Sequence, residues 1–198
     1  MKKYLIKISA TITILSLLAL MLPIQIAQAG EYENETDVMT RLKASTASSH
    51  DIVFDLSSGT AFDATETITV DFGEDSSYFV VDGASSAIAD FDFNDGTERT
   101  IVGVDGDCTG HSGVDDVAVG INDTTGVVTF EACASFASSS SAATVNIEYG
   151  TSAGGTNRVT NPTAQNDVPI YLAGTVGDSG SVAISIISDD QVSVTATV

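Results

Sequence analysis

Apolar residues recur at every second position through most of this 198-residue chain, and this period limits the fold more than any other feature. Stretches such as 51–56 and 66–72 place Ile, Val, Leu or Phe on one side and mostly Asp or Thr on the other. A period of two is typical of β-strands that bury one face, whereas an amphipathic helix repeats every 3.6 residues. No segment after residue 38 keeps the helical period for long. The chain is therefore predicted to be almost entirely β.

Strand patterns follow one another closely, with turn residues between them. The predicted strands are 38–44, 51–56, 66–72, 78–81, 87–93, 99–104, the two arms of 117–133, 143–149, 168–173, 182–187 and 191–198. Ten to twelve short strands separated by turns indicate an all-β, antiparallel β-sandwich. An up-and-down barrel is the alternative fold, although no even series of hairpins favours closure.

Two stretches are predicted to form hairpins. In 117–133, two β-patterned arms flank a short polar turn that contains Gly126. In 87–104, the turn Asn94-Asp95-Gly96 separates two further strand patterns. A Gly-containing polar turn between alternating arms is the usual sequence signal of a hairpin.

Residues 1–29 are predicted to be a signal peptide. Three lysines precede the apolar stretch 8–22, and Ala27-Gln28-Ala29 has the small residues of a cleavage site. The alternative is a retained membrane anchor, but the apolar stretch is short for a bilayer and is followed by Pro23. Cleavage before Gly30 would export the chain to the cell exterior.

The exported part is long enough for one domain with a real core. Residues 30–37 are polar and acidic and are predicted to be a flexible leader. The single β-sandwich domain is then predicted to span 38–198. Its first strand is predicted to place Val38, Thr40, Leu42 and Ala44 on one face.

The two cysteines, Cys108 and Cys133, are predicted to form a disulfide, as is typical of a pair in an exported chain. The bond would join the hairpin 117–133 to the segment before Cys108. Two free thiols, or a metal-binding pair, are the alternative.

The chain has 27 acidic and 7 basic residues, a formal net charge of −20. Signal-peptide cleavage would remove three basic residues and no acidic ones, which leaves −23. This charge excludes nucleic acids as partners, because binding by counterion release needs a basic face, and it repels anionic membranes. Solubility or a saline habitat would also explain the acidity.

Two acidic clusters are candidate calcium sites. The first cluster comprises Asp90, Asp92, Asn94 and Asp95, and the second comprises Asp105, Asp107, Asp115 and Asp116. The first has the spacing of the front half of a calcium loop, but Gly96 falls one place late and Ile101 stands where an EF-hand needs glutamate. The alternative is solvated aspartates on turns and outer strand faces, which the strand pattern favours.

The widest gap between strand patterns is 150–161, which is too polar to be core and is the candidate contact surface. Its predicted contact residues are Gly150, Thr151, Ser152, Gly154, Gly155, Thr156 and Asn157.

No catalytic constellation is recognisable. Gly110-His111-Ser112-Gly113 lacks one residue of the G-x-S-x-G nucleophile motif, and no helix is predicted after it. His50 and His111 are the only histidines available as a base. The protein is therefore predicted not to be an enzyme, and calcium is the only cofactor for which the sequence offers candidate ligands.

Further strand and turn patterns lie in 39–54, 65–72, 154–162 and 173–198, and in E-A-C-A-S-F around Cys133, the partner of Cys108. Together they resemble the exported Ig-like β-sandwich surface proteins of small-genome, uncultured (candidate-phylum) bacteria. None of these motifs is catalytic. The resemblance implies an Ig-like sandwich at the cell surface, often the first domain of a longer protein.

These observations predict a secreted or cell-surface structural or adhesive module that contacts other surface proteins or copies of itself. Contact through end loops, or assembly by edge-strand pairing, would fit strand patterns near both ends of the exported chain. The alternative function is a calcium-assisted carbohydrate-binding module. The absence of Trp and the small number of Tyr residues count against it, because sugar sites usually present aromatic rings.

Overall fold

The structure is a computed structural model that describes residues 30–73 and 78–189. Its strands are β1 (Glu33–Met39), β2 (Ala47–Ser48), β3 (His50–Asp55), β4 (Thr67–Asp71), β5 (Val80–Val81), β6 (Phe91–Asn94), β7 (Thr100–Gly103), β8 (Asp116–Asn122), β9 (Val127–Ala132), β10 (Thr144–Tyr149), β11 (Val159–Thr160), β12 (Gln165–Gly174) and β13 (Gly180–Ile186). Two 3-10 turns, η1 (Gly83–Ser85) and η2 (Ile88–Asp90), precede β6. Among these residues no helix has the length and apolar character needed to cross a membrane.

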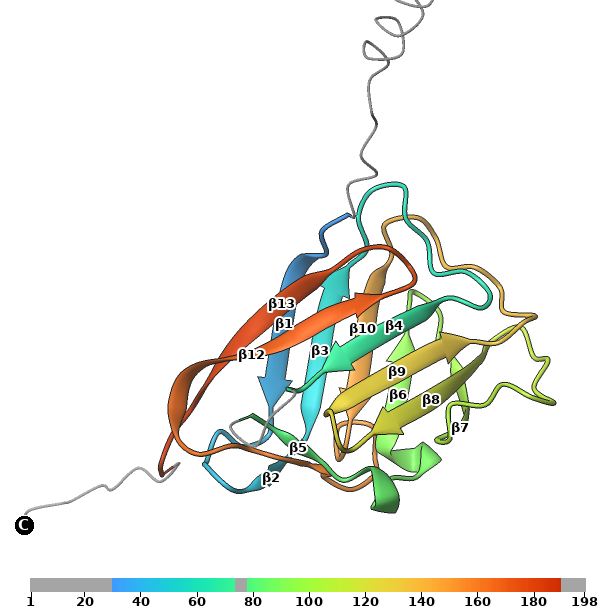
Figure 1. Ribbon diagram of the computed structural model, residues 1–198. Helices are drawn as coiled ribbons and strands as arrows, with labels where there is room; N and C mark the ends of the chain where they lie inside the picture. The colour runs from blue at the N-terminus through green and yellow to red at the C-terminus, as the bar shows by residue number, and fades with distance from the viewer. Residues whose placement is uncertain (1–29, 74–77, 190–198) are drawn as a thin grey trace, which may run out of the picture.

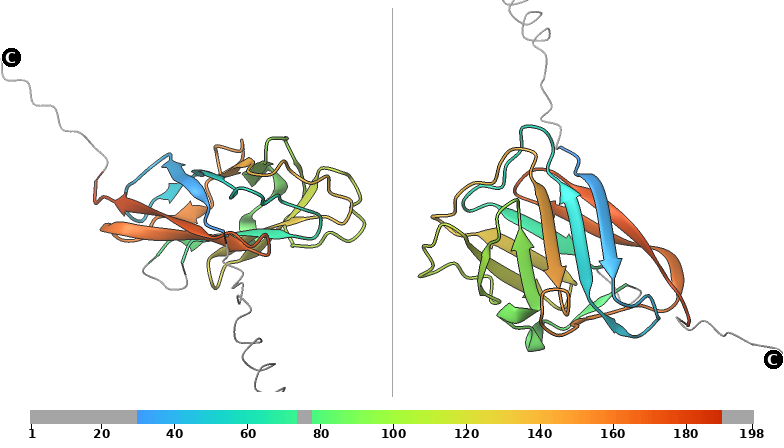
Figure 2. Two further views of the ribbon diagram at one scale, coloured as in Figure 1. Left: turned by 90° about the horizontal axis from the view of Figure 1, so that it is seen from above. Right: turned by 180° about the vertical axis from the view of Figure 1, so that it is seen from behind.

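Most of the strands form two sheets packed face to face, as Figures 1 and 2 show. One sheet has the order β1-β3-β10-β6 and the other has the order β13-β12-β4-β9-β8-β7. A small sheet, β2-β11-β5, lies at one end. All strand pairs are antiparallel except β7 with β8. The chain repeatedly changes sheet between successive strands, as in Ig-like sandwiches, so the predicted fold class is confirmed.

The inner faces of the two large sheets enclose one hydrophobic core. The predicted inward residues of 51–56, 66–72 and 143–149 are all buried. Phe93 from the four-stranded sheet contacts Phe130 of the six-stranded sheet, with ring centroids 5.4 Å apart. Because interiors are close-packed, such contacts fix the spacing of the sheets and hold their outer faces in place.

The predicted hairpin at 117–133 is confirmed, because β8 and β9 pair antiparallel around a turn with Gly126 at φ 77°. The predicted hairpin at 87–104 is wrong. Here β6 belongs to the four-stranded sheet and β7 to the six-stranded sheet. Arg99, which lies between them, is 5% exposed and pairs with Asp95 and Asp115, so the chain crosses from one sheet to the other.

The flexible leader predicted at 30–37 is also wrong, because β1 begins at Glu33 and pairs with β3. The side chain of Asp37 is buried, and its Oδ2 lies 2.7 Å from Nδ1 of the buried His50. Val38, predicted to lead the first strand, is 65% exposed. Because an inward position of β1 holds a carboxylate that pairs with histidine, the strand lacks the alternating apolar residues that predict a strand. The predicted signal peptide and the predicted strand 191–198 lie outside the described residues.

The predicted disulfide is confirmed between Cys108 and Cys133, whose Cα atoms lie 5.4 Å apart. It joins the segment before β8 to the end of β9 and closes a segment of 25 residues. A crosslink of this length stabilises a fold mainly by restricting the unfolded chain.

We predict that replacing both cysteines with serine lowers the free energy of unfolding by about 3 kcal/mol, because the unfolded chain regains the entropy of the open segment. Urea unfolding followed by circular dichroism measures this loss. Reduction of the unaltered protein serves as the control and should cause a similar loss. Equal unfolding midpoints for the two proteins would contradict the prediction.

Candidate functional site: an acidic hollow on the four-stranded sheet

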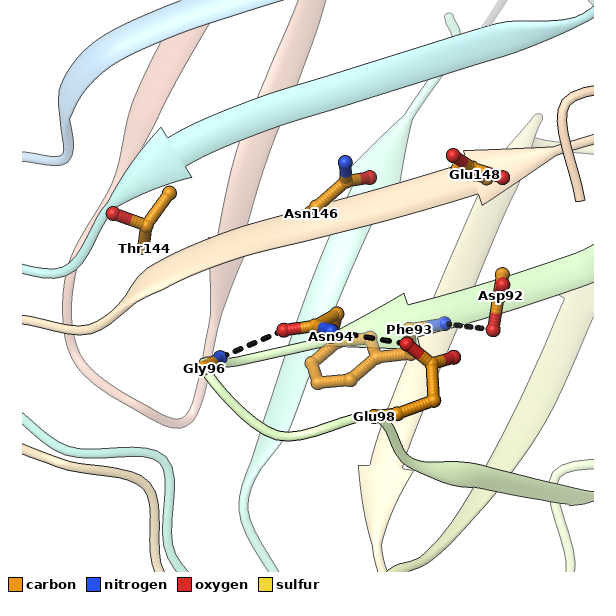
Figure 3. Close-up of a pocket in the computed structure, with 8 residues that line it drawn as sticks. All are labelled: Asp92, Phe93, Asn94, Gly96, Glu98, Thr144, Asn146 and Glu148. Carbon is orange, nitrogen blue, oxygen red and sulfur yellow. Dashed lines mark hydrogen bonds between the residues drawn. The ribbon is translucent and has the colours of Figure 1, made fainter.

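The outer face of the four-stranded sheet carries a hollow of about 400 Å³, which we call the acidic hollow (Figure 3). It is lined by Asp92, Phe93, Asn94, Gly96, Glu98, Thr144, Asn146 and Glu148. β6 and β10 supply its floor, and the segment after β6 supplies Gly96 and Glu98.

The pairing of three strands sets a row of carboxylates across the sheet. Glu148 on β10 lies opposite Asp92 on β6. On its other side Glu148 lies opposite Asp51 on β3. Directly opposed residues in a sheet have Cβ atoms about 5 Å apart, so the three carboxylates are neighbours. This row exists because acidic residues occupy outward positions in the same register.

Glu98 extends the row beyond the sheet. Asn94 Oδ1 accepts a hydrogen bond from the Gly96 nitrogen at 2.9 Å, and Asn94 Nδ2 donates to Glu98 Oε2 at 2.9 Å. Gly96 has φ 95°, which a glycine adopts without strain. This tight turn brings Glu98 beside Asp92, as Figure 3 shows.

The crowded carboxylates perturb one another. Burial, together with the hydrogen bond to Glu98 and the charge of Glu98, raises the pKa of Asp92 to about 6. Burial and the charges of Asp51 and Glu98 also raise the pKa of Glu148. The pKa of Glu98 is lowered, because Asp92 and Asn94 donate hydrogen bonds to it. Asp92 and Glu98 therefore share a proton in mild acid and repel each other at neutral pH.

No basic side chain lines the hollow within the described ranges. Three of the basic residues pair with aspartates elsewhere: Arg99 with Asp95 and Asp115, Arg158 with Asp82 and Asp90, and Lys43 with Asp189. Two buried oxygens accept no hydrogen bond: Asn146 Oδ1, from a lining residue, and Asp51 Oδ1, from the neighbouring strand. The site thus offers negative charge and hydrogen-bond acceptors, which suits a cation that carries N–H donors.

The residues predicted as calcium ligands do not form a metal site. In residues 30–73 and 78–189, no group of three or more His, Cys, Asp or Glu is arranged to hold a metal ion. Asp95 makes a bidentate contact with Arg99, and Asp115 binds the same guanidinium. Arg99 therefore forms ion pairs with two of the carboxylates that the sequence spacing assigned to calcium.

The other predicted ligands divide between backbone contacts and the acidic hollow. Asp90 is 3% exposed and accepts the backbone N–H groups of Ala87 and Thr156. Turn N–H groups of Asp107, Thr109 and Gly113 bind the side chains of Asp105, Asp107 and Asp116, respectively. Asp92 and Asn94 line the acidic hollow, where Glu98, Glu148 and the neighbouring Asp51 were missed by the sequence analysis. For Asp51 and Glu148 the signal was an acid at the outward position of a strand pattern, but register cannot be read from one sequence; Glu98 lies in a turn and had no such signal.

The predicted contact loop is held by its own hydrogen bonds. Asn157 Oδ1 accepts from the nitrogen and the hydroxyl of Thr151, and the Gly155 nitrogen donates to the Gly150 carbonyl. The Thr156 nitrogen donates to Asp90. The loop begins where β10 ends, next to the carboxylate row, and its role in contacts stays a prediction.

No model of a known protein family matches this chain, and a comparison with characterised proteins also gives no match. Among solved structures, the collagen-binding domain from a Staphylococcus aureus adhesin is similar with a TM-score of 0.42 and 9% identity, over 78% of this chain and 96% of that domain. The group B streptococcus pilus 2b backbone protein is similar with a TM-score of 0.44 and 7% identity, over 76% of this chain and 56% of that chain.

We predict that Asp92→Asn increases stability at pH 7 relative to the unaltered protein. The pKa of Asp92 in the folded state, about 6, exceeds the unfolded value of roughly 3.9, so the folded state binds the proton more tightly. The contribution of Asp92 to the free energy of unfolding must then fall as pH rises from about 4 to about 6. The substituted amide does not titrate, so the Asp92→Asn protein does not suffer this loss. Because Asp92 is partly exposed, the gain at pH 7 should be about 0.5–1 kcal/mol.

Urea unfolding at pH 4.5 and pH 7 measures this difference. Asp123→Asn, in the exposed β8–β9 turn, is the matched control and should leave the pH dependence unchanged. An Asp92→Asn protein with the pH dependence of the unaltered protein would show that the carboxylates of the hollow do not repel one another.

Proposed function

We propose that this protein is an exported contact module whose acidic hollow binds lysine or arginine side chains of a partner protein. The observation that carries the proposal is the row Asp51, Glu148, Asp92 and Glu98. Among the described residues, no basic side chain lines the hollow that the last three of them border. Charge repulsion within the row is relieved when a cation enters. Binding therefore gains the Coulomb energy that the fold leaves uncompensated.

The dimensions of the site favour a side chain over a metal ion. The described carboxylates do not converge on one point. Neighbouring strands lie about 4.8 Å apart, so the row from Asp51 to Asp92 crosses about 10 Å of the sheet. A guanidinium or an ammonium on a flexible stem can reach acceptors spread over this distance, and a basic peptide can place more than one of them.

An exposed apolar side chain, Val38, continues the row on its other side. Val38 on β1 lies opposite Asp51, and it is 65% exposed. Lys and Arg side chains pack their methylene stems on apolar surface while the charged group binds oxygen. Val38 is therefore placed to contact the stem of a side chain whose head lies among the carboxylates.

The alternatives have less support from the geometry. Phe93, the one aromatic residue lining the hollow, has no exposed surface, so it offers no ring for a sugar to stack on. Edge-strand pairing through β1 or β13 is also disfavoured, because backbone bridges join Glu31 to Ser179 and Lys43 to Ile187 between the flanks of these two strands. A third bridge joins Asn94 at the edge of β6 to Glu98.

We expect the chain from Gly30 to Val198 to bind a lysine-rich peptide by isothermal titration calorimetry, and the affinity to fall as NaCl rises from 20 to 200 mM. The double variant Glu98→Gln/Glu148→Gln should weaken binding at least about tenfold, the change that 1.4 kcal/mol produces. The control Asp63→Asn/Asp123→Asn removes two charges from exposed turns and should bind as the unaltered protein does.

Two outcomes would contradict the proposal. Equal losses in both double variants would mean that net charge, and not the hollow, attracts the peptide. Binding of a neutral oligosaccharide in place of the peptide would favour the carbohydrate-binding alternative.

A further inference from the structure

A buried carboxylate at the opposite end of β1 from the predicted contact loop takes no part in the acidic hollow. Asp178, in the turn between β12 and β13, is 3% exposed. It accepts hydrogen bonds from the nitrogen and the hydroxyl of Ser57 at 2.7 and 2.9 Å, and from the Thr60 hydroxyl at 3.3 Å. Among the described residues, no basic side chain forms an ion pair with it. A buried carboxylate is stable only when its charge is compensated.

Gly30 lies directly against this carboxylate. A Cβ atom at position 30 would lie 2.0 Å from Asp178 Oδ1 and 2.4 Å from the Ser57 hydroxyl, so only glycine fits here. The Ser179 nitrogen donates to the Gly30 carbonyl at 3.1 Å, and the Tyr32 nitrogen donates to the Ser179 carbonyl at 3.0 Å. These bonds fix the backbone of residue 30. Its nitrogen is bonded, at about 1.5 Å, to the Cα whose Cβ position would meet Asp178.

We propose that signal-peptide cleavage before Gly30 completes this site by creating the cation that Asp178 lacks. Hydrolysis adds one water across the bond between Ala29 and Gly30, so that Ala29 keeps a carboxylate and Gly30 gains an α-amine. That amine is protonated at neutral pH. The α-ammonium of Gly30 then pairs with Asp178, whereas the amide nitrogen of the uncleaved chain carries no charge.

The pair would act as a latch between the two sheets. Residues 30–32 lead into β1 of the four-stranded sheet, while Ser179 leads into β13 of the six-stranded sheet. Asp178 also binds Ser57 and Thr60, which follow β3. One charged contact therefore joins three segments at this end of the sandwich, and only the processed chain can make it. The inference rests on the predicted cleavage site and is independent of the acidic hollow.

Thermal unfolding at pH 7 of three forms of the chain tests the latch: one that starts at a free Gly30, the same chain acetylated at its α-amine, and a chain that keeps Gln28 and Ala29. We expect the free form to melt about 5 °C higher than the other two, because only its amine forms a charged hydrogen bond with the buried carboxylate. Equal melting temperatures for all three forms would overturn the proposal.

The variant Asp178→Asn identifies the partner of the amine. The difference between free and acetylated forms should vanish in Asp178→Asn and persist in Asp63→Asn, an exposed control. A difference that survives in Asp178→Asn would overturn the proposal, since the amine would then act through the overall charge. Mass spectrometry of the exported protein should find Gly30 as the first residue, and any other start would also overturn it.

Discussion

Repulsion among carboxylates is the constraint on which the rest of this structure depends. The sequence holds 27 acidic residues and 7 basic ones, so the fold cannot neutralise most of its acids. Arg99 is buried between Asp95 and Asp115, with its guanidinium 4.1 Å from the centre of the Phe136 ring. Arg158, which is partly exposed, pairs with the buried Asp90. Because these two arginines pair with other carboxylates, the row on the four-stranded sheet has no basic partner among the described residues.

The two outer faces of the sandwich consequently differ. Outward positions of the four-stranded sheet carry Asp51, Glu148 and Asp92 side by side. On the six-stranded sheet, Asp71 lies opposite Tyr171 and Val127, and Glu131 lies opposite Thr67 and Ala118, so its outward acids are not directly opposed. The proposed basic partner would meet adjacent carboxylates only on the four-stranded sheet, and electrostatic steering would orient it before contact.

The sequence predicted those parts of the fold that depend on local pattern. Alternation identified the buried residues Ile52, Phe54, Ile68 and Val70, and the polar turn around Gly126 identified the β8–β9 hairpin. Pattern failed where a charged side chain faces inward, because its partner is distant in sequence. The buried side chain of Asp37 pairs with His50, and that of Asp90 pairs with Arg158, 68 residues away. The acidic hollow was found only in part for the same reason: Asp92 was identified, but its register with Glu148 depends on how the sheet assembles.

The most direct test of cation binding is an NMR titration of the side-chain carboxyl carbons in the chain from Gly30 to Val198, with and without a lysine-rich peptide. A bound cation stabilises the carboxylate form, so the pKa of Asp92 should fall from about 6, and the resonances of Glu98 and Glu148 should move with it. The resonance of Asp123 in its exposed turn should stay in place. A pKa of Asp92 that is unchanged by saturating peptide, or shifts confined to exposed turns, would contradict the account.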